Sequence, residues 1–149
     1  MEQLSVTKLQ SNIYRIQENS SFMNVDSYLV CGEEKAAVID GLGIAEGLYE
    51  CAKKLTDKPL CMIVTHGHPD HCGKGMQEFM EAGCDIYLSF KDMYMVKEMY
   101  GDKLNTEQFH DIENGKRFDL GDVSLEAIAL PGHTNGSMLL YMEREKLLF

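Results

Sequence analysis

Short runs rich in hydrophobic residues recur over the first forty residues, and the hydrophobic positions then change to a helical spacing. Such runs are typical of β-strands, and short polar turns separate one run from the next. The predicted strands cover residues 4–9, 13–17, 25–30 and 36–39. In residues 44–55 the hydrophobic side chains recur at the spacing of one helix face, which predicts an amphipathic helix.

After residue 60, short hydrophobic runs alternate with helical segments, and the pattern ends in two strands joined as a hairpin. The predicted strands are 60–64, 85–88, 116–118, 123–129, 138–142 and 146–149, and the predicted helices are 75–82 and 93–100. Ser89-Phe90-Lys91-Asp92 has the form of a capping box at the start of the last helix. Since the sequence shows no internal repeat and no linker, this order predicts one α/β domain over residues 1–149.

Three of the five histidines stand within six residues, directly after the apolar run 60–64. The segment contains His66, His68 and His71, with Asp70 between the last two. Residues two apart in an extended chain point the same way, so His66 and His68 can hold one ion together. Imidazole nitrogen and carboxylate oxygen suit zinc, and also iron or manganese. Such a density of ligands favours a metal site over unrelated core and surface histidines.

A fourth histidine, His133, follows another strand-like run. Pro131 and Gly132 predict a tight turn that presents the His133 side chain at the end of that strand. Together with His66 and His68 it would form a site of three histidines with one open position for water. That arrangement is typical of catalytic rather than structural zinc.

Three segments form a pattern in a fixed order along the chain. Asp40 ends an early strand, residues 66–71 read His-x-His-x-Asp-His, and residues 131–137 read Pro-Gly-His-Thr-x-Gly-Ser. The pattern resembles that of the metallo-β-lactamase-fold hydrolases, a superfamily that includes glyoxalase II-like thioesterases, lactonases and nucleases. The resemblance runs from about residue 12 to the last residue. It implies an αββα sandwich in which a mixed sheet carries helices on its outer face.

The resemblance is incomplete at the carboxyl end. Members of the superfamily continue past the strand matched by residues 146–149 into an Asp that bridges two metals, and later supply a further histidine. This sequence ends at Phe149, so we expect a partial sandwich, truncated before its second half is complete. The apolar residues Leu147, Leu148 and Phe149 would then lack a partner strand, which predicts a homodimer or larger assembly.

The resemblance also implies the activity. We expect a metal-dependent hydrolase of small esters or thioesters, glyoxalase II-like, that uses a metal-bound hydroxide. His66, His68 and His133 would hold the first ion, with zinc expected and iron or manganese as alternatives. Asp70 and His71 would hold a second ion, or Asp70 would be the catalytic group that positions the water.

Two other functions stay open. The chain could be an inactive metal-binding half-domain that self-associates, because the bridging Asp and the last histidine are missing. It could also be an iron-dependent relative that acts on persulfide or oxygen, because such enzymes share much of the motif. Metal analysis combined with a panel of thioester, lactone and phosphodiester substrates would separate these functions.

Composition excludes some partners. The net charge is −10, whereas binding to a nucleic-acid backbone needs clustered Lys and Arg. No apolar run approaches the roughly 18 residues of a membrane span, and the polar first residues do not resemble a signal peptide. We therefore expect a cytoplasmic protein that acts on a small molecule and contacts neither nucleic acid nor membrane.

The five cysteines are an odd number without Cys-x-x-Cys spacing, which argues against a disulfide framework or a cysteine zinc site. Cys72 directly follows the histidine cluster, but burial as a small apolar residue is the better interpretation. The fifth histidine, His110, lies in a polar stretch and matches none of the motifs. We expect it to be exposed or hydrogen-bonded locally.

Gly41-Leu42-Gly43 follows a predicted strand and precedes a predicted helix, as a dinucleotide-binding loop would. That motif needs a third glycine at position 46, which is Glu46. The better interpretation is a tight turn beneath the metal site, with Asp40 as a carboxylate that orients the histidine segment.

Overall fold

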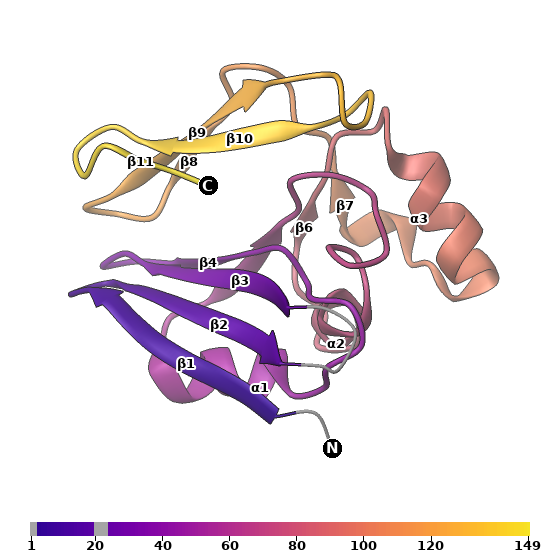
Figure 1. Cartoon of the computed structure of the whole chain (residues 1–149). Coiled ribbons are helices and arrows are strands. Elements are labelled where there is room, and N and C mark those ends of the chain that lie inside the picture. Colours follow the sequence, from indigo (N-terminus) through magenta and orange to yellow (C-terminus); the bar gives the residue numbers. More distant parts are fainter. Residues whose placement is uncertain (1–2, 20–23) are drawn as a thin grey trace.

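Two β-sheets face each other in the computed structural model, which describes residues 3–19 and 24–149 (Figure 1). Strands β1 to β4 of the larger sheet pair antiparallel, whereas β4 to β7 pair parallel. The larger sheet follows chain order: β1 (Gln3–Gln10), β2 (Ile13–Asn19), β3 (Asn24–Cys31), β4 (Ala36–Ile39), β5 (Leu60–Ile63), β6 (Ile86–Tyr87) and β7 (Phe109–His110). The smaller, antiparallel sheet has the order β11-β10-β9-β8, from β8 (Arg117–Asp119), β9 (Ser124–Ala129), β10 (Met138–Met142) and β11 (Leu147–Leu148).

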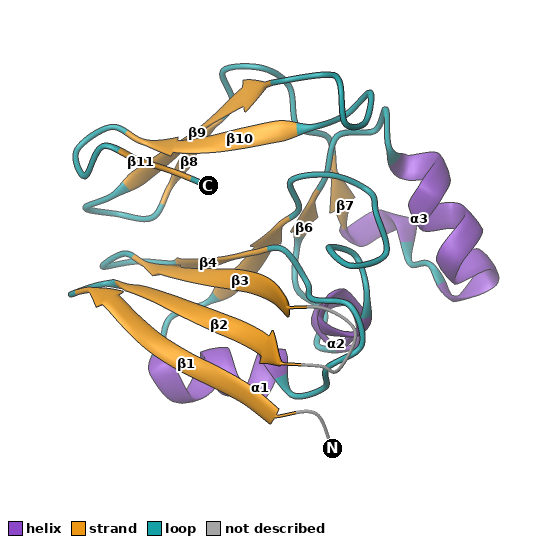
Figure 2. Cartoon of the chain, in the orientation of Figure 1, coloured by secondary structure: helices purple, strands orange, loops and turns teal. Residues whose placement is uncertain are grey.

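The helices α1 and α2 cover the face of the larger sheet that points away from the smaller sheet (Figure 2). The helical segments are α1 (Leu48–Leu55), α2 (Lys74–Glu81) and α3 (Met93–Tyr100), followed by the 3-10 turns η1 (Gly101–Lys103) and η2 (Thr106–Gln108). The predicted α/β class, with a mixed sheet and helices on its outer face, is therefore confirmed.

The middle of the larger sheet is buried on both faces, as strand β4 shows. Its side chains alternate between two separate cores, because successive residues of a strand point to opposite faces. Val38 packs with residues of the three helices, whereas Ala37 and Ile39 pack with β9 and β10 of the smaller sheet. All four residues of β4 are buried. A strand covered on both faces is uniformly apolar, as this one is.

Every predicted strand and helix is present, and all ends but one agree within two residues. The exception is α1, which begins at Leu48 rather than at position 44. The carboxylate of Glu18 accepts the N–H of Ile44, and that of Glu78 accepts the N–H of Gly47 at 2.6 Å. These two side chains, distant in sequence, satisfy N–H groups ahead of the helix, and Gly47 has φ 94°, a left-handed conformation that a helix through this residue could not contain.

Two other expectations differ from the structure. Asp92 is the N-cap residue of α3, but its side chain makes no capping hydrogen bond, so the predicted capping box is wrong. Strand β7 was absent from the prediction because its two residues, Phe109 and His110, lie in a polar stretch too short for any period to appear. Pairing with β6 forms this strand, and that pairing is not visible locally.

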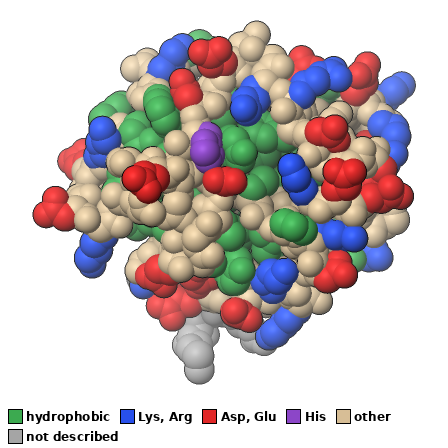
Figure 3. Space-filling model, turned by 180° about the vertical axis from the view of Figure 1, so that it is seen from behind, with side chains coloured by type: hydrophobic (Ala, Val, Ile, Leu, Met, Phe, Trp, Pro, Cys, Tyr) green, Lys and Arg blue, Asp and Glu red, His purple; other side chains and the backbone are tan. Residues whose placement is uncertain are grey.

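None of the helices in the described ranges is long and apolar enough to cross a membrane. On the face shown in Figure 3, acidic and basic side chains are interspersed around patches of apolar surface. The charged residues on this face therefore do not form one continuous basic surface of the kind that binds nucleic acid.

Candidate metal centre

The candidate site lies where three loops meet at the carboxyl ends of strands β4 and β5. These two strands are parallel, so the residues that follow them, Asp40 and Thr65, lie at the same end of the sheet. The turn between β9 and β10 reaches this end of the larger sheet from the smaller sheet. Its position relative to the larger sheet is fixed in part by a hydrogen bond from the Met138 N–H to the Thr65 carbonyl, at 2.9 Å.

Three of the predicted ligands come together. One ligand atom each from His66, His68 and His133 lies within 4.8 Å of the other two. Nδ1 of His68 and Nε2 of His133 are 3.0 Å apart, close to the separation of about 3.3 Å that two ligands have around tetrahedral zinc. Without a metal ion, one of these two nitrogens must carry a hydrogen and donate it to the other. A metal ion bound by both nitrogens would take the place of that hydrogen.

His66 gives the sharpest test of whether these residues fit a metal. The Thr65 hydroxyl donates to the Asp40 carboxylate at 2.9 Å, so its oxygen is left to accept from Nδ1–H of His66, 3.1 Å away. The lone pair of His66 is then on Nε2. That atom is buried and lacks a hydrogen-bond partner within the described residues. A buried polar atom without a partner is costly, and a metal ion would satisfy it.

The electrostatics of His66 favour its neutral form. Burial, together with the nearby His71, lowers the pKa of His66 from 6.5 to about 4, although Asp40 opposes the shift. The ring is therefore neutral at physiological pH, and a histidine must be neutral to bind a metal.

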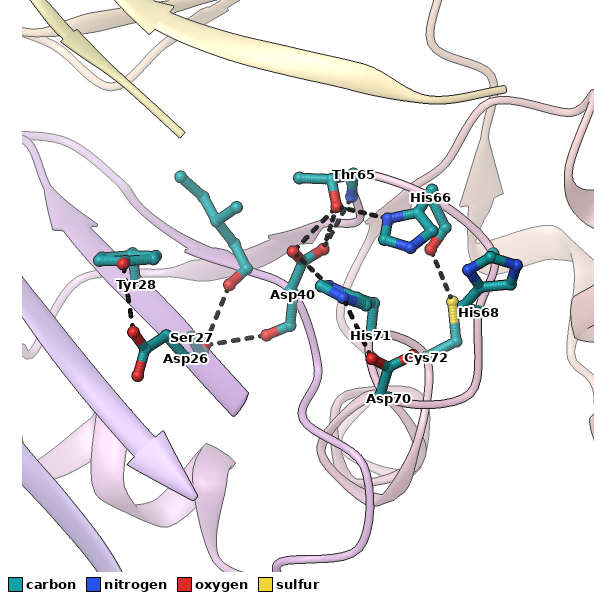
Figure 4. A network of polar contacts seen from close by, with 12 residues as sticks. Asp26, Ser27, Tyr28, Asp40, Thr65, His66, His68, Asp70, His71 and Cys72 are labelled. Carbon is teal, nitrogen blue, oxygen red and sulfur yellow. Dashed lines mark hydrogen bonds and ion pairs between the residues drawn. The ribbon is translucent and has the colours of Figure 1, made fainter. Parts of the chain in front are cut away.

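Asp40 connects the two ends of the histidine segment (Figure 4). Its Oδ1 accepts the backbone N–H of Thr65 at 2.7 Å, and its Oδ2 accepts Nδ1–H of His71 at 2.8 Å. Its backbone has φ 65°, a left-handed conformation that Asp tolerates better than most residues. The Ser27 hydroxyl donates to the Asp40 carbonyl at 2.8 Å. Asp40 thus lies where the sequence predicts, beside the histidine segment and bonded to it.

Asp70 and His71 lie beside this group rather than within it. Oδ2 of Asp70 is 3.5 Å from Nε2 of His71, and the Asp70 side chain is 41% exposed. Burial lowers the pKa of His71, but the hydrogen bond and charge of Asp40, with the charge of Asp70, outweigh burial and raise it above 6.5. The His71 ring centroid is only 4.1 Å from that of His66, so a second ion held here would be close to the first.

The remaining sequence candidates lie outside the cluster. Cys72 is buried, and its thiol donates to the His66 carbonyl at 3.4 Å, in line with the predicted burial. The His110 side chain is 42% exposed, as predicted, and bonds the side chain of Asp85 at 2.7 Å, a partner 25 residues away rather than a local one. The turn at Gly41 packs under the histidine segment, where its N–H donates to the His71 carbonyl at 2.7 Å.

A groove of about 470 Å³ opens beside the histidines. Its wall combines His66, His71 and His133 with the apolar side chains of Leu130, Leu139 and Phe149. The arrangement places an apolar surface next to the candidate metal ligands, as a site for a small organic substrate would.

One functional candidate was not predicted. The carboxylate of Asp92 is completely buried and bonds both loops that carry the three histidines. Locally, its sequence signal is that of a helix cap. The sequence carries one further signal, which is a glycine in each histidine loop: Gly67 and Gly136. A glycine allows the backbone to approach another group closely.

Comparison with known proteins supports the resemblance. Residues 21–149 match the family model described as the metallo-beta-lactamase superfamily. The chain is 30% identical over 128 residues to a hydroxyacylglutathione hydrolase, GloC, of Haemophilus influenzae, covering 78% of this chain and 60% of the relative. It is 29% identical over 173 residues to an acyl-coenzyme A thioesterase, MBLAC2, of Gallus gallus, covering 95% and 62%. The chain thus spans about three-fifths of the length of these curated relatives.

Solved structures show the same fold. A metallo-beta-lactamase from Pontibacter korlensis superposes with a TM-score of 0.77 at 23% identity, covering 99% of this chain and 70% of that one. A flavoprotein from Thermotoga maritima superposes with a TM-score of 0.75 at 20% identity, covering 96% and 40%. These likenesses extend over nearly the whole chain and concern the fold alone.

Proposed function

Because this chain belongs to the metallo-beta-lactamase superfamily, we propose that it is a metal-dependent hydrolase of small esters or thioesters. His66, His68 and His133 are the ligands of the first metal ion in this proposal. The observation that carries it is the buried Nε2 of His66, which lacks a partner within the described residues and belongs to a group of three converging imidazoles. Zinc suits this nitrogen donor set, and iron and manganese are the alternatives.

A bound zinc ion would polarise a carbonyl and lower the pKa of a water molecule to about 7. The residues of the chain would supply the rest. In this proposal Asp70, half exposed beside His71, accepts a proton from the attacking water and returns it to the leaving group. Asp40 holds His71 and the Thr65–His66 pair in fixed orientations, so these groups need little rearrangement during a reaction.

The preference for thioesters has two supports. The curated relatives described above include a hydroxyacylglutathione hydrolase and an acyl-coenzyme A thioesterase. In addition, the groove beside the histidines is lined by Leu130, Leu139 and Phe149, which suit an acyl chain better than a charged phosphodiester. The partner in this proposal is a small molecule, and neither nucleic acid nor membrane is involved. Five free cysteines suit a reducing compartment, so we include a cytoplasmic location.

The experiment combines zinc reconstitution near pH 7.5 with a panel of glutathione thioester, acyl-coenzyme A, lactone and phosphodiester substrates. We expect about one zinc ion or more per chain and the fastest turnover on a thioester. His133→Ala should lose both zinc and turnover, whereas the matched control His110→Ala should keep both. A chain that binds no zinc after reconstitution contradicts the proposal.

A second candidate is a metal-binding form that is inactive and self-associates. It is favoured by the smaller sheet, whose edge strand β11 pairs on one side with β10 and exposes 56% of Leu148. In this candidate a homodimer or larger assembly would cover that edge. Zinc binding without turnover on any substrate of the panel, together with a dimer in light scattering, would select it over the hydrolase.

A further inference from the structure

A single buried carboxylate joins the two loops that carry the proposed metal ligands. Asp92 precedes α3 and has no solvent exposure. Its Oδ2 accepts the N–H of Gly67 at 3.0 Å and the hydroxyl of Thr134 at 2.6 Å, and its Oδ1 accepts the N–H of Gly136 at 2.8 Å. Three donors compensate the burial of this charge, as a buried carboxylate requires.

The three groups that donate to Asp92 lie next to the proposed metal ligands. Gly67 lies between His66 and His68, and Thr134 directly follows His133. The carboxylate of Asp92 therefore binds backbone or side chain next to each of the three histidines. Since the loops belong to different sheets, Asp92 acts as a common anchor for both.

The two glycines allow the backbone to approach this anchor. A Cβ placed on Gly67 would lie 2.9 Å from the Cβ of Asp92, and one on Gly136 would lie 2.7 Å from its Cγ. Both separations are shorter than ordinary van der Waals contact, so any side chain at either position would push one loop away from Asp92.

The hydroxyl of Thr134 extends the contact through the second loop. Because it donates to Asp92, its oxygen must accept from the hydroxyl of Ser137, 2.8 Å away. The oxygen of Ser137 in turn accepts the backbone N–H of Thr134 at 3.0 Å. Asp92 thus fixes the direction of the hydrogen bond between the hydroxyls of Ser137 and Thr134.

We propose that Asp92 is a positioning residue that sets the separation of the two histidine loops and thereby the affinity and geometry of the metal site. This inference rests on the proposed ligands His66, His68 and His133. Asp92 does not contact the metal in this proposal. It acts through the backbone of the loops, as residues that hydrogen-bond around metal ligands, without binding the metal, commonly do.

The test is Asp92→Asn, which keeps the shape but cannot keep all three contacts. An amide has one acceptor atom, so its NH₂ group faces either the Gly136 N–H or the Gly67 and Thr134 donors. We expect Co²⁺ affinity to fall roughly 10- to 100-fold, the usual effect of removing a group behind a ligand. We also expect the visible absorption of the bound Co²⁺ to weaken as the ligands depart from tetrahedral geometry.

The matched control is Asp111→Asn. Asp111 also accepts a backbone N–H before α3, that of Phe90 at 2.7 Å, but it is exposed and contacts neither histidine loop. It should leave Co²⁺ affinity and spectrum unchanged. A second pair guards against a general loss of folding: Thr134→Val should weaken Co²⁺ binding, and Thr134→Ser, which keeps the hydroxyl, should restore it.

A metal-free measurement completes the design. Hydrogen exchange should be faster in Asp92→Asn than in the wild-type chain at the Gly67 or the Gly136 amide, whichever loses its acceptor, because the Asn side chain can accept on one side only. Wild-type affinity and spectrum in both Asp92→Asn and Thr134→Val would overturn the inference and leave the metal site intact. A lower melting temperature with an unchanged Co²⁺ spectrum would overturn it too, since the role would then be structural. If the wild-type chain binds no Co²⁺, the proposed ligands themselves are wrong.

Discussion

The two loops that carry the proposed ligands are held in different ways. The segment from Thr65 to His71 is fixed by Asp40 at both ends, and its first ligand, His66, is only 8% exposed. The turn that carries His133 is fixed through Thr134 and Gly136, while His133 itself is exposed. One loop thus buries its first proposed ligand, and the other presents its ligand from the surface. We therefore expect the first loop to be a rigid half-site that is preformed before a metal ion binds, and the second to be a more accessible half-site.

The largest expected effect comes from removing one proposed ligand from each loop and comparing the two variants. Both His66→Ala and His133→Ala should weaken zinc binding by roughly a thousandfold, since each removes one of three ligands from a binding free energy of about 10–16 kcal/mol. Only His66→Ala should also lower the melting temperature of the metal-free chain, because the cavity it leaves and the lost hydrogen bond to Thr65 outweigh the removal of the unpartnered Nε2. Competition with a zinc chelator measures the affinity and calorimetry the stability. Equal stability losses in both variants would show that the loops are equally preformed.

Asp70→Asn tests the chemistry of the preformed loop without removing a ring. The amide keeps the shape but loses the charge and the proton acceptor, so thioester turnover should fall by roughly 10²–10⁴-fold. Zinc bound to the three histidines should remain. The measurement is turnover at saturating zinc, with zinc content determined on the same samples. Turnover close to that of the wild-type chain would leave Asp70 with a structural role only.

Asp40→Asn tests what keeps the first loop in place. Asn tolerates the left-handed backbone at this position, so the change isolates the side chain. The amide lacks the charge and has only one acceptor oxygen for Thr65 and His71, so the metal-free chain should lose about 1–3 kcal/mol of unfolding free energy in urea. The control Asp57→Asn, at a side chain that is 91% exposed, should change stability by less than about 0.5 kcal/mol. Equal losses in the two variants would contradict the anchoring role.

The sequence predicted most of the fold because most elements are long enough to show a period. Strand β7, with two residues, and the late start of α1 were not predictable in this way. Each depends on partners far along the chain: β6 for the strand, Glu18 and Glu78 for the helix start. The periodicity of a segment contains no information about such partners.

The candidate site shows the same division. The histidines are visible in the sequence because metal ligands cluster along a chain, and imidazoles at this density are rare away from a metal. Asp92 is not, because its immediate neighbours predict a helix cap and its partners Gly67 and Gly136 lie 25 and 44 residues away. A carboxylate that joins two loops is recognised only when both loops are seen together.

The smallest expected effect uses Cys72 as a reporter of the preformed loop. Burial, reinforced by the charge of Asp40, raises the pKa of the Cys72 thiol well above 9, so little of the reactive thiolate exists at pH 8. Burial also raises the pKa of the Cys51 thiol on α1, but this side chain is partly exposed and so is easier for a reagent to reach than Cys72. Alkylation of the metal-free chain should therefore label Cys51 before Cys72.

Mass spectrometry of the labelled peptides measures both rates, and urea-unfolded chain gives the reference. Raising the pH from 8 to 9 should speed the labelling of Cys51, because more thiolate forms as the pH approaches its pKa, while Cys72 should stay nearly unlabelled. If Cys72 instead reacts quickly without metal and is protected by added zinc, the first loop forms only around the ion. The contrast between a rigid and an accessible half-site would then have to be abandoned, and both loops would be ordered together by the metal.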